Sequence, residues 1–471
     1  MSSSNRPPGT TPPTPTPTPT PGARGWPPLQ QRDLGSLARL ILLGLLVGLA
    51  CWPLNLVDGW QTALLLRLPG YDGGSWQLPS LLMALAPLTV VPLLLALQNG
   101  ILASGAGSGI PQTIESLEQP AAAAELLGLR PTVARVGLWS AASLALLPLG
   151  REGPVVQVGA AVAQTLQRWA PALAGRINPG SLLAMGAAAG LAGGFNSPLM
   201  GVLFMVEELT GSFRTSLIWP GLVVCSAAAL MSSLVGLPLF PLGMLPTLIP
   251  EWQQLAWALP VGVGGGLLGG VFARGLLLAG GWIQPRVARH PWRWGLAIGA
   301  ALAAMALLSG GWSGGDGEAL MRLLLEERGG LPIPGSPVSL IGWLLLLLSR
   351  IVAPILALAS GIPGGLIDPA FTLGAVFGGG TLQLLGGDVQ LGVALGMAAG
   401  LAGATQLPLM TLVFALRLAG DQQWLFGLLL SAVLASYAGR RLQPKPVYHA
   451  LAELLSKQRS SLRGRPGGKR G

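Results

Sequence analysis

The chain has 471 residues, of which 51% are hydrophobic and only 10% are charged. Soluble proteins carry about 25% charged residues, so this composition excludes an ordinary soluble domain. The formal net charge of +10 is carried largely by loops and ends, a pattern that favours contact with anionic lipid headgroups rather than with nucleic acid.

Apolar stretches of about 20 residues, the length that spans a bilayer, recur along the chain at 37–57, 78–98 and 339–359. They predict an all-α polytopic membrane protein. Residues 1–30 contain a Pro/Thr-rich repeat that predicts a disordered cytoplasmic arm, and residues 456–471 form a basic tail. Arginines cluster before the first span and after the last, so both termini are expected in the cytoplasm.

An internal repeat divides the membrane region. The segment GAAAGLAGGFNSPLMGVLF at 186–204 matches GMAAGLAGATQLPLMTLVF at 396–414, and EGPVVQVGA at 152–160 matches IDPAFTLGA at 367–375. The matches keep their order and include prolines, although chance similarity of glycine-rich apolar segments is the alternative. We therefore predict two membrane repeats, residues 31–240 and 241–455, that form one site at their interface near the bilayer midplane.

Three short motifs combine glycine, proline and polar residues inside apolar surroundings: GSGIP at 107–111, GREGP at 150–154 and GGLIDP at 364–369. Glycine lets the backbone bend and proline favours a first helical turn. Each motif therefore predicts a helix that begins within the membrane. Several such N-termini would hold a dehydrated anion with backbone N–H groups and helix dipoles.

Glu152 in GREGP lies beside Arg151 in one of the most apolar parts of the chain. An ionisable residue within the membrane is by default a functional candidate. Its carboxylate could occupy an anion site as a tethered competitor and leave when protonated, which would couple proton movement to anion movement. A structural ion pair with Arg151 is the alternative.

These motifs, together with KPVYHAL at 445–451, resemble the CLC family of chloride channels and proton-coupled chloride antiporters over about 420 residues. The resemblance implies a CLC-type fold of two inverted halves with broken and tilted helices, of the prokaryotic type without a C-terminal regulatory domain. It implies a chloride site formed by Ser108, flanked by Gly107 and Gly109, by the Tyr448 hydroxyl, and by the backbone N–H groups of Leu366 and Ile367. It also implies that Glu152 is the external gating glutamate and Glu208 the internal proton glutamate.

Glu208 favours an antiporter, because the channel branch of the family usually carries an apolar residue there. An uncoupled voltage- or pH-gated chloride channel is the alternative. Glu207 could line the same proton entry or be a solvated residue at a helix end. Arg135 could add a positive field to the path or be an interfacial arginine. Asp368 departs from the family pattern and could cap the following helix or form a titratable or cation-binding site.

The remaining expectations concern partners and location. The sequence has two histidines and no HExxH motif, so we expect no metal, no cofactor other than the transported ions, and no enzyme activity. The resemblance implies a homodimer with one pathway in each subunit, located in a prokaryotic plasma membrane.

Overall fold

The computed structural model describes residues 34–67, 76–171, 177–234, 250–326, 340–420 and 422–463, and the arm predicted for residues 1–30 lies outside these ranges. Within them the chain forms helices and no β-strand, as the composition predicts. The helices are α1 (Leu34–Arg67), α2 (Leu78–Leu85), α3 (Pro87–Asn99), α4 (Ile110–Glu118), α5 (Ala123–Leu126), α6 (Leu129–Leu144), α7 (Glu152–Trp169), α9 (Pro179–Phe195), α10 (Pro198–Phe204), α11 (Thr215–Ser233), α12 (Glu251–Arg289), α13 (Pro291–Leu308), α14 (Glu318–Glu326), α15 (Leu340–Ala359), α16 (Ile367–Leu385), α17 (Val389–Thr405), α18 (Pro408–Ala419), α19 (Leu425–Leu442) and α20 (Val447–Arg463).

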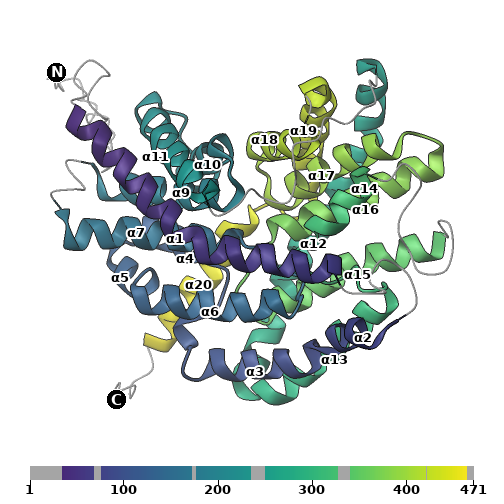
Figure 1. Cartoon of the computed structure of the whole chain (residues 1–471), viewed down its shortest axis with the longest axis horizontal. Coiled ribbons are helices and arrows are strands. Elements are labelled where there is room, and N and C mark those ends of the chain that lie inside the picture. The colour runs from purple at the N-terminus through teal and green to yellow at the C-terminus, as the bar shows by residue number, and fades with distance from the viewer. Residues whose placement is uncertain are drawn as a thin grey trace, which may run out of the picture.

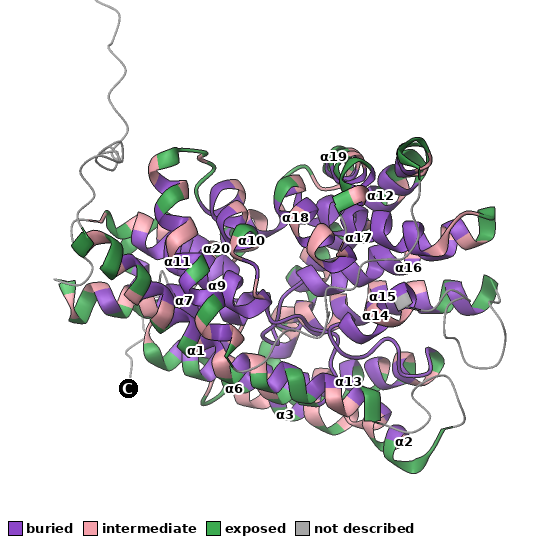
Figure 2. Ribbon diagram, turned by 45° about the horizontal axis from the view of Figure 1, so that its top comes forward, coloured by how far each residue is buried: buried purple, intermediate pink, exposed green. Residues whose placement is uncertain are grey.

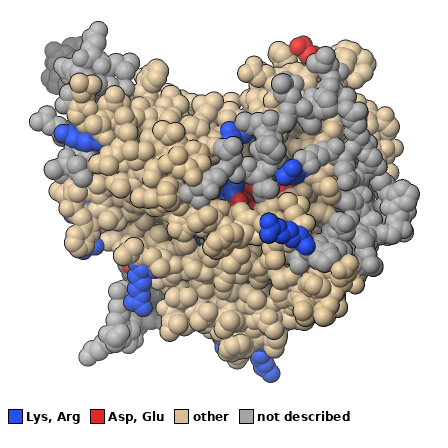
Figure 3. Space-filling model, viewed as in Figure 1, with Lys and Arg blue, Asp and Glu red and all other residues tan. Residues whose placement is uncertain are grey.

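Seven stretches of the described chain are long and apolar enough to cross a membrane: Leu34–Arg67, Leu78–Asn99, Thr215–Ser233, Glu251–Arg289, Pro291–Leu308, Leu340–Ala359 and Gln422–Lys457. The spans expected at 37–57 and 78–98 fall within two of them, and residues 340–359 of the span expected at 339–359 form a third. Large apolar side chains such as Trp60, Leu278 and Ile341 are exposed, and the face in Figure 3 shows few charged atoms. Such a surface suits contact with lipid, and the chain is an integral membrane protein.

Two helices are much longer than a perpendicular span. α1 has 34 residues and α12 has 39, whereas about 20 residues cross a bilayer. Such helices must cross tilted or bent. α1 contains Pro53 near its middle, and Figure 1 shows it changing direction along its course. Proline removes a backbone hydrogen bond and bends a helix, which accounts for this change of direction.

The two halves lie side by side in Figure 1, with α7, α9, α10 and α11 on the left and α16 to α19 on the right. Each half contains the same close helix pair. A Cβ on Gly159 of α7 would lie 2.1 Å from the carbonyl oxygen of Gly186 in α9. A Cβ on Gly374 of α16 would lie 2.0 Å from that of Gly396 in α17. The repeat predicted from sequence is therefore a repeat of backbone packing, which small residues make possible.

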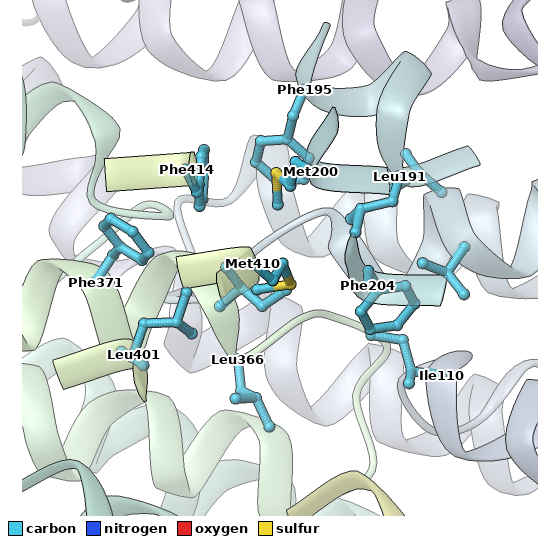
Figure 4. Packing of buried hydrophobic residues seen from close by; sticks show 14 of the residues in the cluster. Ile110, Leu191, Phe195, Met200, Phe204, Leu366, Phe371, Leu401, Met410 and Phe414 are labelled. Atoms are coloured by element: carbon cyan, nitrogen blue, oxygen red, sulfur yellow. The ribbon is translucent and has the colours of Figure 1, made fainter. Parts of the chain in front are cut away.

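Aromatic and methionine side chains fill the interface between the halves. Figure 4 shows Phe195 and Met200 of the first half near Phe414 and Met410 of the second, with Phe371 farther to the left and Phe204 farther to the right. The rings of Phe195 and Phe414 meet edge to face with centroids 5.0 Å apart, and those of Phe371 and Phe414 are 4.6 Å apart. The repeat pairs Met200/Met410 and Phe204/Phe414 thus belong to one shared core, which holds the two halves in register. In Figure 2 buried residues run continuously through this region.

Candidate functional site

Three helices begin at the three glycine–proline motifs, as predicted: α4 at Ile110, α7 at Glu152 and α16 at Ile367. The segments that precede them pair with one another. Gly150 N–H donates to the carbonyl of Gly365 over 3.1 Å, and Gly365 N–H donates back over 2.8 Å. Gly107 N–H donates to the carbonyl of Gly361 over 2.9 Å. These bonds bring the starts of helices from both halves to one place.

Glu152 extends from α7 of the first half onto the first turn of α16 in the second. Its Oε1 accepts a hydrogen bond of 2.5 Å from the backbone N–H of Asp368. A Cβ on Gly365 would collide with the Glu152 carboxylate, so only glycine leaves room for it. The carboxylate is fully buried. A negative group thus occupies the unpaired N–H groups at a helix N-terminus, which is an anion-binding position.

Arg151 does not pair with Glu152 through a salt bridge, so the ion pair considered from the sequence is not formed. Its guanidinium instead contacts Asp58 of α1 and, at 3.0 Å, Glu318 of α14. It also lies 4.7 Å above the ring of Phe195. The gating candidate Glu152 is therefore held by backbone N–H groups rather than by a fixed cation.

The hydroxyls of Ser108 and Tyr448 are buried and have no hydrogen-bond partner among the described residues. A buried polar group without a partner is unfavourable, so both hydroxyls are available to a ligand. A Cβ on Gly153 would lie 2.3 Å from Ser108 Oγ. Ser108 therefore packs directly against the first turn of α7. Tyr448 lies in the first turn of α20, whose yellow ribbon runs through the centre of Figure 1.

A cavity of about 440 Å³ leads to this region. Gly107, Ser108 and Leu366 line it, together with residues of α3, α12 and α20. Its polar lining is formed by uncharged side chains: Gln98, Asn99, Ser108, Gln112, Gln284 and Ser360. Neutral donors can replace part of an ion's hydration shell without holding the ion too tightly to release it.

Arg135 is buried inside the protein, next to the loop that carries Ser108. It is 1% exposed, and it donates to the carbonyls of Gly107 over 2.9 Å and Ala106 over 2.8 Å. Gly107 and Gly109 have φ values of +85° and +117°, which favour glycine. Arg135 therefore fixes the loop that positions Ser108 and places a positive charge beside it.

Asp368 makes no side-chain capping hydrogen bond, so the capping interpretation is not supported. Both of its carboxylate oxygens are buried without a partner in the described part of the chain. Glu152, Glu318 and Asp316 repel this carboxylate electrostatically, and Arg151 attracts it. Asp368 thus belongs to a buried acidic group next to Glu152.

Asp58, Asp316 and Glu318 lie close enough to share a metal ion. The guanidinium of Arg151, however, already contacts two of these three carboxylates. Arg350 donates to the carbonyls of Gly314 and Gly315 and so holds the loop that carries Asp316. The guanidinium of Arg151 thus occupies the place next to these carboxylates that a metal ion would need. The three residues therefore do not fit a separate metal ion.

Glu208 lies in a short π-helical turn, η4 (Met205–Leu209), at the end of α10. It is buried, and its Oε1 has no hydrogen-bond partner among the residues described. Glu207 lies in the same turn, and its carboxylate accepts backbone hydrogen bonds from Leu409 and Met410 over 3.1 and 2.7 Å. It therefore caps α18 of the other half, which begins with Pro408 and has no cap of its own.

Sequence reasoning missed His449, Asp58 and Glu318. His449 follows Tyr448 directly, and its ring lies next to Glu208. Asp58 is the single acid within the 34 residues of α1. An isolated charge in an apolar helix is the signal that would have found Asp58, since such charges are rarely unpaired in a membrane. Glu318 carries no such signal because the loop before it is polar.

The fold and the site define a membrane protein of two related halves whose helix N-termini meet around buried hydroxyls and a carboxylate. The family model described as "Voltage gated chloride channel" matches residues 89–440, about three quarters of the chain. The chain therefore belongs to this family, the CLC family.

Similar proteins extend over almost the whole chain. The H(+)/Cl(-) exchange transporters ClcA of Salmonella arizonae and Salmonella typhi are each 28% identical to it, and each match covers 91% of this chain and 91% of the relative. A solved structure of a slow cyanobacterial Cl-/H+ antiporter has a TM-score of 0.71 at 22% identity, covering 91% of this chain and 100% of that one. A CLC-type fluoride/proton antiporter has a TM-score of 0.66 at 25% identity, covering 89% and 99%.

Proposed function

We propose that this protein is a chloride/proton antiporter. The observation that carries the proposal is the position of Glu152, whose carboxylate occupies the N-terminus of α16. The relatives named H(+)/Cl(-) exchange transporter support it. In this proposal a chloride ion and the Glu152 carboxylate compete for one place, and protonation of Glu152 decides which of them holds it.

The anion is bound by neutral donors. The hydroxyls of Ser108 and Tyr448 and the backbone N–H groups of Leu366 and Ile367 provide the contacts, with Gly107 and Gly109 shaping the loop around Ser108. The cavity that reaches Ser108 and Leu366 is the route from one side of the membrane. These two unpartnered hydroxyls favour chloride transport over a role as a membrane scaffold, which would leave them unexplained.

Protons move between two glutamates. Glu208 takes up a proton on the cytoplasmic side and Glu152 releases it on the outer side. Tyr448 is buried, and in this proposal its ring lies along the path between the two glutamates. The chain works as a homodimer with one pathway per subunit, in a prokaryotic inner membrane and with both termini in the cytoplasm.

Reconstitution into liposomes tests the proposal. Chloride and proton fluxes are recorded at the same time from vesicles that hold a chloride gradient and begin without a pH gradient. The expected result is chloride efflux with uphill proton uptake that a protonophore abolishes. Chloride flux without any proton movement would replace the antiporter by an uncoupled channel. Absence of any chloride flux, with fluoride flux present, would assign the site to a different halide.

A further inference from the structure

His449 lies between the buried Glu208 and the exposed Glu118. Its Nε2 is 3.2 Å from the backbone carbonyl oxygen of Glu208 and 3.7 Å from Glu208 Oε1. Its Nδ1 is 3.9 Å from Glu118 Oε1 at the end of α4. One imidazole ring therefore faces a carboxylate on each side.

The three side chains form a sequence from the interior to the surface. The relative exposures are 2% for the Glu208 side chain, 34% for His449 and 60% for Glu118. Glu208 Oε1 has no hydrogen-bond partner within the described residues. The imidazole therefore lies between the solvent-exposed Glu118 and the buried Glu208 carboxylate, on the route that a proton from solvent would take.

The hydrogen-bond partners define the state of the ring. A carbonyl oxygen can only accept, so Nε2 carries the hydrogen and donates it to the carbonyl of Glu208. Nδ1 then keeps its lone pair, which faces Glu118 and the solvent. The 3.7 Å from Nε2 to Glu208 Oε1 exceeds a hydrogen bond, but a small rotation of the carboxylate or one bridging water closes it.

We propose that His449 is the proton-transfer residue that supplies Glu208, with Glu118 as the surface acid that collects the proton. A proton from Glu118 or solvent adds to Nδ1 and forms an imidazolium. The Nε2 proton then passes to the Glu208 carboxylate, giving a neutral carboxylic acid and a neutral imidazole protonated on Nδ1. Loss of that proton to solvent and uptake at Nε2, or a ring flip, resets the residue.

The charges around His449 favour this task. Glu118 of α4 and Glu208 of η4 face the ring from the elements packed against α20. On α20 itself, Glu453 interacts electrostatically with His449 and is paired with Lys445. Arg459 binds Glu115 of α4 over 2.5 Å and also binds Glu125, which ties α20 to α4. An imidazole side chain can both accept and donate a proton, which a transfer residue requires.

The inference rests on the proposed role of Glu208, and the experiment separates the two. Proton and chloride fluxes are measured for wild type, Glu208→Gln, His449→Ala and His449→Gln in liposomes. We expect His449→Ala to retain chloride flux and to lose about tenfold or more of the proton flux. Added imidazole, which enters the space left by the ring, should restore proton flux to His449→Ala but not to Glu208→Gln.

His290 provides the matched control, because it is the chain's other histidine and is exposed after α12. His290→Ala should show wild-type fluxes and no response to imidazole. Glu118→Gln should slow proton flux less than His449→Ala does, since solvent also reaches the ring. Wild-type coupling in His449→Ala, or a loss that imidazole does not restore in a variant with unchanged thermal stability, would overturn the inference. If wild type itself showed chloride flux without proton flux, the proposed function would instead be refuted.

Discussion

The ends of α10 and α18 occupy matching places in the two halves, but they differ in backbone conformation and in charge. α10 passes into the π-helical turn that carries Glu207 and Glu208. α18 continues as a regular helix through Arg417 and Leu418, the residues that match those two acids at the repeat offset of 210. Packing therefore does not require an acid at this place. Because π-turns often occur at functional sites, this difference supports the proton role proposed for Glu208.

The starts of α7 and α16 give a second comparison. Each carries an acid before or beside the matched prolines Pro154 and Pro369. The Glu152 side chain crosses to the other half and binds the N–H of Asp368, whereas the Asp368 carboxylate has no partner among the described residues. The same local motif thus brings one acid onto the N-terminus of α16 and leaves the other beside it.

The largest effect is expected for Glu152→Gln. Glutamine resembles a permanently protonated glutamate and cannot release a proton. We expect chloride movement to continue while uphill proton transport disappears, as measured by simultaneous flux recording in liposomes. A variant that pumps protons as well as wild type would show that another residue couples the two ions.

Glu208→Gln and Leu418→Gln test the comparison of the two helix ends directly. Glutamine keeps the size and hydrogen bonding of Glu208 but does not titrate. Proton flux should fall to background in Glu208→Gln, while chloride flux persists. Leu418→Gln places the same side chain at the matching position of the other half and should leave the coupling ratio unchanged. Equal effects of both variants on proton flux would mean that the asymmetry carries no function.

The glycine pairs of the two halves should be equally sensitive. Gly159→Val and Gly374→Val each introduce a side chain where even a Cβ would lie about 2 Å from a backbone oxygen. We expect each to destabilise the protein by about 1–3 kcal/mol, measured by thermal unfolding in detergent. Gly137→Ala is the control, because a Cβ there has nothing within 4 Å. A stable Gly374→Val variant would show that the two close helix pairs are not equivalent.

The smallest effect concerns Asp368. In the Glu152→Gln background the chloride site is no longer occupied by a carboxylate, and Asp368→Asn removes one further negative charge beside it. Chloride affinity should rise a few-fold, which corresponds to about 1 kcal/mol, as measured by calorimetric titration. Unchanged affinity would mean that Asp368 is already neutral when chloride is bound.

Much of the fold could be predicted from local signals. Apolar length predicts the spans, and the glycine–proline motifs predict where α4, α7 and α16 begin, because both features depend on a few neighbouring residues. The repeat was visible for the same reason: Gly159 and Gly374 each must accept a neighbouring backbone, and no other residue fits there.

The partners of the charged side chains, by contrast, depend on which helices the tertiary structure brings together. The sequence placed Arg151 beside Glu152, yet the guanidinium binds Asp58 and Glu318, far away along the chain. Glu207 caps a helix of the other half, and His449 meets Glu208 across 241 positions. In a membrane a charge finds its partner wherever the helices bring one within reach, because leaving it unpaired is costly. Which charges meet is therefore a property of helix packing and is absent from the local pattern.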